Sequence, residues 1–173
     1  MYLISVYFDE KTDAALRRMM IKIAENCGND YMLRGNVPPH MTISAFEGGN
    51  EELVIDCLGE FAEQLKKSEV YLASAGCFPG VIFLSAVLNE YLHGISVRVH
   101  RILNDQKDIQ ISRFYQPFQW MPHITLGKKL TQSEMQEAFR ILYSEIQMMK
   151  GQIVKIGLAR TNPYHNLKEW ELQ

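Results

Sequence analysis

The sequence of 173 residues contains no apolar run near the length of about 18 residues that is needed to cross a lipid bilayer. Its first residues, MYLISVYFDEKTD, have neither the basic start nor the small-residue cleavage site of a signal peptide. A proline- or serine-rich linker and a low-complexity tract are also missing. Together these absences predict one globular domain over residues 1–173, a cytoplasmic location and no membrane partner, and we expect a monomer.

Cysteine is scarce, because Cys27, Cys57 and Cys77 are the only three in the chain. Their wide spacing contains no CxxC pair and no Cys/His pattern typical of a zinc site. An odd number of separated cysteines therefore predicts buried, reduced thiols, as expected of a cytosolic protein.

An excess of positive charge is also missing, since the formal net charge is −2. Proteins that hold long nucleic acids by the backbone usually carry a basic excess, because each neutralised phosphate contributes to affinity. We therefore expect no long nucleic acid as a partner. A small nucleotide with one or two phosphates, or the end of an RNA strand, remains compatible with this charge.

What the sequence does contain is an alternation of strand-like and helix-like segments. Apolar and β-branched patterns predict strands at 2–8, 40–46, 70–80, 80–88, 123–127, 151–160 and 166–173. Helical spacing and capping residues predict helices at 9–28, 51–67, 89–104 and 131–149. Thr131 and Glu134 match a capping box at the start of the last helix. The segment 109–122 is rich in aromatic residues and is expected to be a loop or an irregular strand.

One short pattern occurs twice, as PPHMTIS at 38–44 and as MPHITLG at 121–127. Alternate residues of a strand share a face. The first copy is therefore expected to present His40, Thr42 and Ser44 on one face and Met41, Ile43 and Ala45 on the other. In the second copy the corresponding polar face would hold His123, Thr125 and Gly127, with Ile124 and Leu126 packed behind it.

Two such strips facing one another would place two imidazoles and two hydroxyls at one point. This set suits a phosphodiester, since hydroxyls can donate to phosphate oxygens while one imidazole accepts a proton and the other donates one. Histidine fits because its ordinary pKa, about 6.5, allows either state near neutral pH. A single histidine on a strand is usually structural, so the prediction depends on the recurrence of proline, histidine and threonine in the same register.

The stretches HMTI and HITL resemble the paired HxTx signature of the 2H phosphoesterase superfamily, which includes bacterial 2′-5′ RNA ligase-like proteins and cyclic phosphodiesterases. The approach to the second motif and the segment after it, FQWMPHITLGKKLTQSEM, is also similar to that group. Spacing, length and element order extend the resemblance over nearly the whole chain. It implies an α+β fold with two pseudo-twofold lobes, antiparallel sheets lining a central cleft and helices outside.

The resemblance further implies a metal-independent phosphoesterase, a hydrolase without a cofactor. By motif, His40 would be the proton donor and His123 the proton acceptor, while Thr42 and Thr125 hold the phosphate. A near-symmetric pair cannot itself reveal which imidazole is the acid, and the roles exchange in the reverse reaction. Several relatives carry an arginine shortly after the second motif, where this chain has Lys128 and Lys129, which attract phosphate without a bidentate fork.

Four residues outside the two motif pairs are candidates for substrate binding: Lys128 for the phosphate, and Arg113, Tyr115 and Phe46 for a base. Stacking of a base on an aromatic ring contributes roughly 1–3 kcal/mol. The alternative for the aromatic residues is that they cover the edge of the core.

The predicted function is cleavage of 2′,3′-cyclic phosphate or 2′-5′ phosphodiester bonds of nucleotides or RNA ends. An alternative is a non-catalytic nucleotide or RNA-end binding protein, although binding alone does not require two proton-transfer groups. A histidine-based metalloenzyme is a third possibility, which the absence of an acidic cluster near either motif disfavours.

Overall fold

The computed structural model describes all 173 residues and is a mixed α+β structure. The strands, all paired antiparallel, are β1 (Tyr2–Phe8), β2 (Met41–Gly48), β3 (Ser68–Phe78), β4 (Val81–Ala86), β5 (Ile109–Ile111), β6 (His123–Lys128), β7 (Met149–Arg160) and β8 (His165–Glu171). The helices are α1 (Glu10–Cys27), α2 (Tyr31–Arg34), α3 (Glu51–Ala62), α4 (Glu90–Asn104) and α5 (Gln132–Glu145), with one 3-10 turn, η1 (Arg113–Tyr115). None of the helices has the length and apolar character needed to cross a lipid bilayer.

Capping residues set the helix starts, as the sequence predicts. The Asn50 side chain accepts backbone N–H groups at the start of α3, and the Asn89 side chain does the same for α4. Both hydrogen bonds of the Thr131–Glu134 capping box are present at α5. The helix ends differ more from the prediction: α3 ends five residues earlier than expected, at Ala62 rather than 67, and α5 stops at Glu145 because Met149 already begins β7.

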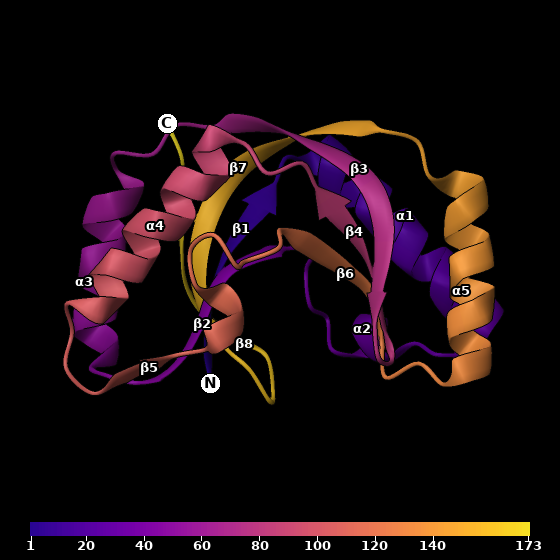
Figure 1. Ribbon diagram of the computed structural model, residues 1–173, viewed down its shortest axis with the longest axis horizontal. Coiled ribbons are helices and arrows are strands. Elements are labelled where there is room, and N and C mark those ends of the chain that lie inside the picture. The colour runs from indigo at the N-terminus through magenta and orange to yellow at the C-terminus, as the bar shows by residue number, and fades with distance from the viewer.

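The strands form one continuous sheet in the order β5-β2-β1-β7-β3-β4-β6, with β8 beside β7. β7 belongs to both halves of this sheet. Its residues from Ile153 onward pair with β1, whereas its first residues, from Met149 to Ile153, pair with β3 (Figure 1). One long strand therefore carries both lobes, and each motif strand lies toward an opposite end of the sheet.

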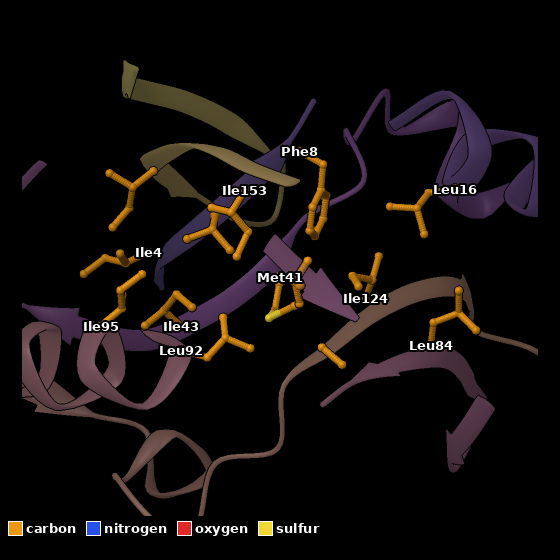
Figure 2. Close-up of a cluster of buried hydrophobic side chains, with 14 of the residues drawn as sticks. Ile4, Phe8, Leu16, Met41, Ile43, Leu84, Leu92, Ile95, Ile124 and Ile153 are labelled. Atoms are coloured by element: carbon orange, nitrogen blue, oxygen red, sulfur yellow. The ribbon is translucent and has the colours of Figure 1, made fainter. Parts of the chain in front are cut away.

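Two helices cover each half of the sheet. α3 and α4 lie beside the half that contains β2, and α1 and α5 lie beside the half that contains β6 (Figure 1). Apolar side chains between the sheet and these helices form one core cluster of 34 buried residues. Figure 2 shows Ile43 of β2 in this cluster together with Ile4, Leu92 and Ile95. The opposite face of the motif strands, called the free face below, is covered by none of these four helices; only the short α2 and η1 lie near it.

Each motif strand contains one extra residue, and the extra residue occupies the same place in both motifs. On β2, Thr42 pairs with Ser5 and Ser44 with Ile4, so Ile43 has no partner of its own. On β6, Thr125 pairs with Phe83 and Gly127 with Ile82, which leaves Leu126 without a partner. Both are β-bulges, which interrupt the regular alternation of side chains between the two faces of a strand.

The bulges correct the predicted faces. Ser44 shares its side of the sheet with Ile4 and is 2% exposed, so it points into the core rather than to the polar strip. Gly127 also faces the core, since a Cβ there would lie 3.2 Å from Ile82 and 3.1 Å from Leu130. The next residue, Lys128, is thereby turned to the free face. The predicted alternation is confirmed up to Ile43 and Leu126, and from Ser44 and Gly127 onward it is wrong.

The predicted environment of the cysteines is also wrong in part. All three thiols are free, but none is buried: Cys27 and Cys57 are half-buried and Cys77 is exposed. Burial raises the pKa of the Cys27 and Cys57 thiols, with nearby acidic side chains adding to the effect.

Two buried serines on β1 and β2 provide a test of the bulge. Ser44 Oγ has no hydrogen-bond partner, whereas Ser5 Oγ donates to Thr42 Oγ1 at 3.4 Å, and both side chains are 2% exposed. A buried hydroxyl without a partner costs stability, while a buried hydrogen bond contributes about 1 kcal/mol. We expect Ser44→Ala to leave the free energy of unfolding in urea unchanged or raise it by up to about 2 kcal/mol. Ser5→Ala should lower it, and a loss of stability in Ser44→Ala alone would contradict the core-facing register.

Candidate active site

The free face of the sheet carries a cleft of about 1480 Å³ between the two motif strands. His40, Thr42, His123 and Thr125 all line it, so the structure brings the four predicted motif residues together. The motif strands lie toward opposite ends of the sheet, which is strongly curved (Figure 1). They nevertheless lie close to one another, and residues of both line the cleft. This convergence is what the duplicated pattern predicts.

The two imidazoles are held in the same way. His40 Nδ1 lies 2.8 Å from the carbonyl oxygen of Pro38, and His123 Nδ1 lies 2.9 Å from that of Met121. A carbonyl can only accept, so Nδ1 carries the proton in both rings. The other nitrogen, Nε2, is then an acceptor in the neutral ring and a donor in the charged ring. Both imidazoles are therefore set up for proton transfer through Nε2.

The surroundings of His40 favour its neutral form. The side chain is half-buried, and the Tyr7 ring lies 6.3 Å from the imidazole, centroid to centroid. Burial lowers the pKa of His40, and the positive charges of His123 and Lys128 lower it further, while the bond to Pro38 acts in the opposite direction. The Tyr7 hydroxyl in turn lies 3.2 Å from that of Tyr164, whose side chain lines the cleft.

His123 has an aromatic environment instead. Its ring meets Phe78 edge-on at 5.5 Å between centroids, and Phe83 is 5.0 Å away. Phe83 fits there because residue 76 is glycine: a Cβ on Gly76 would lie 2.4 Å from the Phe83 ring. These aromatic neighbours restrict the plane of the His123 imidazole in addition to its backbone hydrogen bond.

The two threonines also differ. Thr42 is 8% exposed and accepts a hydrogen bond from Ser5. Burial raises the pKa of Tyr115, and the nearby Thr42 hydroxyl partly offsets that rise. Thr125 is half-buried and has no such hydroxyl neighbours among the hydrogen bonds of the structure. The first motif therefore offers a hydroxyl already fixed in a network, and the second offers a freer one.

The cleft is cationic although the whole protein is slightly acidic. Arg34, Arg113 and Lys128 line it, and its lining contains no aspartate or glutamate. Arg34 is paired with Asp30 at 2.7 Å, whereas Arg113 and Lys128 form no ion pair. The positive charge is thus concentrated where the histidines lie. Such a site attracts a compact anion and does not provide the broad basic face that long nucleic acids require.

Three of the four additional candidates line the cleft, namely Lys128, Arg113 and Tyr115, and their role in substrate binding stays a prediction. Phe46 is not brought there, because the bulge at Ile43 places it on the core side of β2. Its ring is 2% exposed and stacks on Tyr2 at 5.1 Å between centroids. Phe46 is therefore a core residue, which is the alternative weighed for it.

Sequence reasoning missed several residues of the cleft. Phe78 is the last residue of β3, inside a strand that the sequence does predict but without a role in the site. Tyr164 lies between β7 and β8, and Arg34 lies in α2, a helix that the sequence pattern does not predict. None of them belongs to a motif, so no local signal marks them. The structure also contains no group of three or more His, Cys, Asp or Glu side chains arranged to hold a metal ion.

A model of the 2′-5′ RNA ligase superfamily matches residues 8–163 of the chain. No curated protein matches the sequence. Among solved structures, TT0787 of Thermus thermophilus is 20% identical with a TM-score of 0.59, and the alignment covers 99% of this chain and 97% of TT0787. LigT of E. coli complexed with 3′-AMP is 16% identical with a TM-score of 0.64, at 99% and 97% coverage. At these identities the structural likeness establishes a shared fold.

The lowered pKa of His40 predicts the pH range in which its imidazole titrates and a dependence of the free energy of unfolding on pH. Between the folded pKa and the ordinary value of about 6.5, the native protein binds fewer protons than the unfolded chain. The resulting stability is present above about pH 6.5 and is lost as the pH falls through the folded pKa. We expect the His40 imidazole signal in NMR to titrate below pH 6.5. Below pH 6.5 the free energy of unfolding should change less steeply with pH in His40→Asn than in the wild type. Titration of His40 at or above pH 6.5 would contradict the buried environment.

The two adjacent lysines predict different effects on phosphate binding. Lys128 lines the cleft, whereas Lys129 lies outside the lining, with its ammonium 4.4 Å from the centre of the Tyr31 ring. Because one charge-assisted contact is lost, Lys128→Met should weaken binding of inorganic phosphate or 3′-AMP about ten-fold or more, measured by calorimetry at low salt. Lys129→Met is the matched control and should bind nearly as wild type. Equal losses in the two variants would show that only net charge matters.

Proposed function

The chain belongs to the 2′-5′ RNA ligase superfamily, a group of 2H phosphoesterases, and from this premise we propose that it cleaves 2′,3′-cyclic phosphate or 2′-5′ phosphodiester bonds of nucleotides or RNA ends. The observation that carries the proposal is the matched pair of imidazoles. Both have Nδ1 tied to a backbone carbonyl, which leaves both Nε2 atoms for chemistry in one cleft.

The reaction needs one proton acceptor and one proton donor. In hydrolysis of a 2′,3′-cyclic phosphate, water attacks phosphorus and gives its proton to the neutral imidazole. The bond to one ribose oxygen breaks, and that oxygen takes a proton from the charged imidazole. Positioned groups of this kind contribute typically 10²–10⁴-fold each.

The family resemblance assigns the donor role to His40 and the acceptor role to His123. In the protein alone, the lowered pKa of His40 opposes the charged form that a donor needs. A bound phosphate brings negative charge next to the ring and acts against that effect, because an opposite charge favours the protonated imidazole. The proposed assignment therefore requires substrate binding to raise the pKa of His40.

The phosphate would be held by hydroxyls and by one cation. Thr42 and Thr125 lie on the same free face as the histidines and can donate to non-bridging oxygens. Lys128 enters this face only from the second motif, since the equivalent residue of the first motif is Ala45. The phosphate is thus expected to lie nearer the second motif strand, where the charge is.

A base would stack at the η1 end of the cleft. Phe114 lines the cleft, its side chain is 67% exposed, and the Arg113 guanidinium lies 4.9 Å from the ring centre. Tyr115 is instead half-buried against the core cluster, with its hydroxyl near that of Thr42. Phe114 is therefore the more available ring for stacking, with Arg113 beside it and Tyr115 supporting the motif threonine. The nucleotide in the LigT complex, 3′-AMP, is a ligand of the size this arrangement would take.

A non-catalytic nucleotide or RNA-end binding protein is the alternative. It would use the same cations and aromatic rings, and it would bind nucleotides without turnover. The duplicated hydrogen bond that frees Nε2 on both histidines favours catalysis, because binding alone does not require two identical ring orientations.

The proposed chemistry predicts turnover that is independent of added metal. A panel of 2′,3′-cyclic nucleotides and 2′-5′ linked dinucleotides would be incubated with the protein in excess EDTA. We expect hydrolysis by the wild type and a loss of about 10²–10⁴-fold in His40→Ala and in His123→Ala, since each removes one proton-transfer group. The rate should show a bell-shaped dependence on pH.

His165→Ala is the matched control, because His165 is exposed at the start of β8 and does not line the cleft. Its turnover should equal that of the wild type. No hydrolysis of any panel member, with 3′-AMP still raising the melting temperature, would favour the binding protein. Wild-type turnover in either histidine variant would remove that histidine from the mechanism.

A further inference from the structure

The segment between β5 and β6 connects the two motifs in space as well as in sequence. It leaves β5, which pairs with β2 only at Phe46–Gly48, and it ends at the second motif. Its first residue, Ser112, donates its backbone N–H to the Ala45 carbonyl at 2.8 Å. Beyond this point no strand is hydrogen-bonded to the outer edge of β2, so the carbonyl groups nearer to His40 need another donor.

Trp120 provides that donor. Its indole Nε1 donates to the Thr42 carbonyl oxygen at 3.0 Å, and the side chain is 6% exposed within the core cluster. A tryptophan indole has one N–H and no acceptor, so this bond uses its whole hydrogen-bonding capacity. The bond joins a residue just before the second motif to the central threonine of the first motif.

The chain continues from Trp120 directly into the groups that orient His123. The Met121 carbonyl accepts the proton of His123 Nδ1, and the Pro122 carbonyl accepts the Ala86 N–H of the adjacent strand β4 at 3.0 Å. On the other side, Thr42 lies two residues after His40. The Trp120 side chain therefore links the backbone that positions the His40 imidazole to the backbone that positions the His123 imidazole.

We propose that Trp120 is a positioning residue, which sets the separation of the two catalytic imidazoles by linking the approach to the second motif to the first motif strand. The inference rests on the proposed function, because a separation matters only where both histidines act on one phosphate. The Trp120 ring is among the residues that line the cleft, but the bond itself joins only the indole to the backbone of β2, and Trp120→Phe keeps an aromatic ring at the lining. The expected effect is on kcat rather than on KM, since a misplacement near 1 Å can cost about 100-fold in rate.

The opposing interpretation is that Trp120 only fills the core. Trp120→Phe distinguishes the positioning role from the core-filling role, because phenylalanine keeps an aromatic ring and loses the N–H. A tryptophan analogue with sulfur in place of the N–H, 3-benzothienylalanine at position 120, preserves the shape more closely and is used if the phenylalanine variant does not fold. Trp170→Phe is the matched control, since the chain has only two tryptophans and Trp170 lies on β8 against Gly59, away from the cleft lining.

Kinetics on the preferred substrate would give the first result. We expect kcat to fall about 10- to 100-fold in Trp120→Phe with KM changed less than about three-fold, and no change in Trp170→Phe. Wild-type kcat in Trp120→Phe would overturn the inference. The inference would also be overturned if, in both variants at position 120, the loss in rate were matched by an equal loss of folded protein measured by circular dichroism.

An NMR measurement gives a readout that does not need turnover. Loss of the indole N–H should shift the ring signals of both His40 and His123, because the link acts on both motifs. Trp170→Phe should shift neither. A shift confined to His123, which is close to residue 120 in sequence, would overturn the inference even if the wild type has no activity on the panel. Absence of wild-type turnover with both rings shifted would contradict the proposed reaction and leave the link intact.

Discussion

A strand that packs one face on a core can offer only alternate side chains to the other face, and the site depends on where this alternation is broken. In both motifs the break follows the threonine, at Ile43 and at Leu126. Histidine and threonine thus reach the cleft under the regular pattern, while the apolar residues between and after them fill the core. After the bulge the faces exchange, which buries Ser44 and exposes Lys128 to the cleft.

The change of faces after each bulge makes the cleft-facing residues of the two motifs chemically different. Both histidines have the same backbone partner two residues earlier, and both threonines face the cleft. The lysine, however, has alanine as its counterpart in the first motif. Tyr7 lies beside His40, whereas Phe78 and Phe83 surround His123. The duplication supplies paired proton-transfer groups, and the surroundings provide the asymmetry that an acid and a base require.

Two connections keep the strips in register across the cleft. β7 hydrogen-bonds with β1 in one half and with β3 in the other, so the halves cannot separate without breaking the sheet. The Trp120 bond to Thr42 acts on the cleft side, close to the reacting groups. A sheet can twist between the two motif strands, which would change the distance between the imidazoles. A direct bond between the motifs limits this twisting close to the two histidines.

The sequence by itself determined the four long helices with their starts, the order of the strands other than β5, and the four motif residues. Capping residues and the repeated Pro-His-x-Thr pattern are local signals, because a cap or a strand face is specified by residues a few positions apart. For the same reason the local pattern places Phe46 and Ser44 on the wrong side: a bulge is a property of the pairing between β2 and β1, and it leaves no mark in the sequence of either strand alone. Phe78, Tyr164 and Arg34 reach the cleft from a strand end, a turn and a short helix that the packing places there. Tertiary structure decided which of the two lysines faces the phosphate site, because the register that sets this is fixed by hydrogen bonds to a strand about forty residues away in the chain.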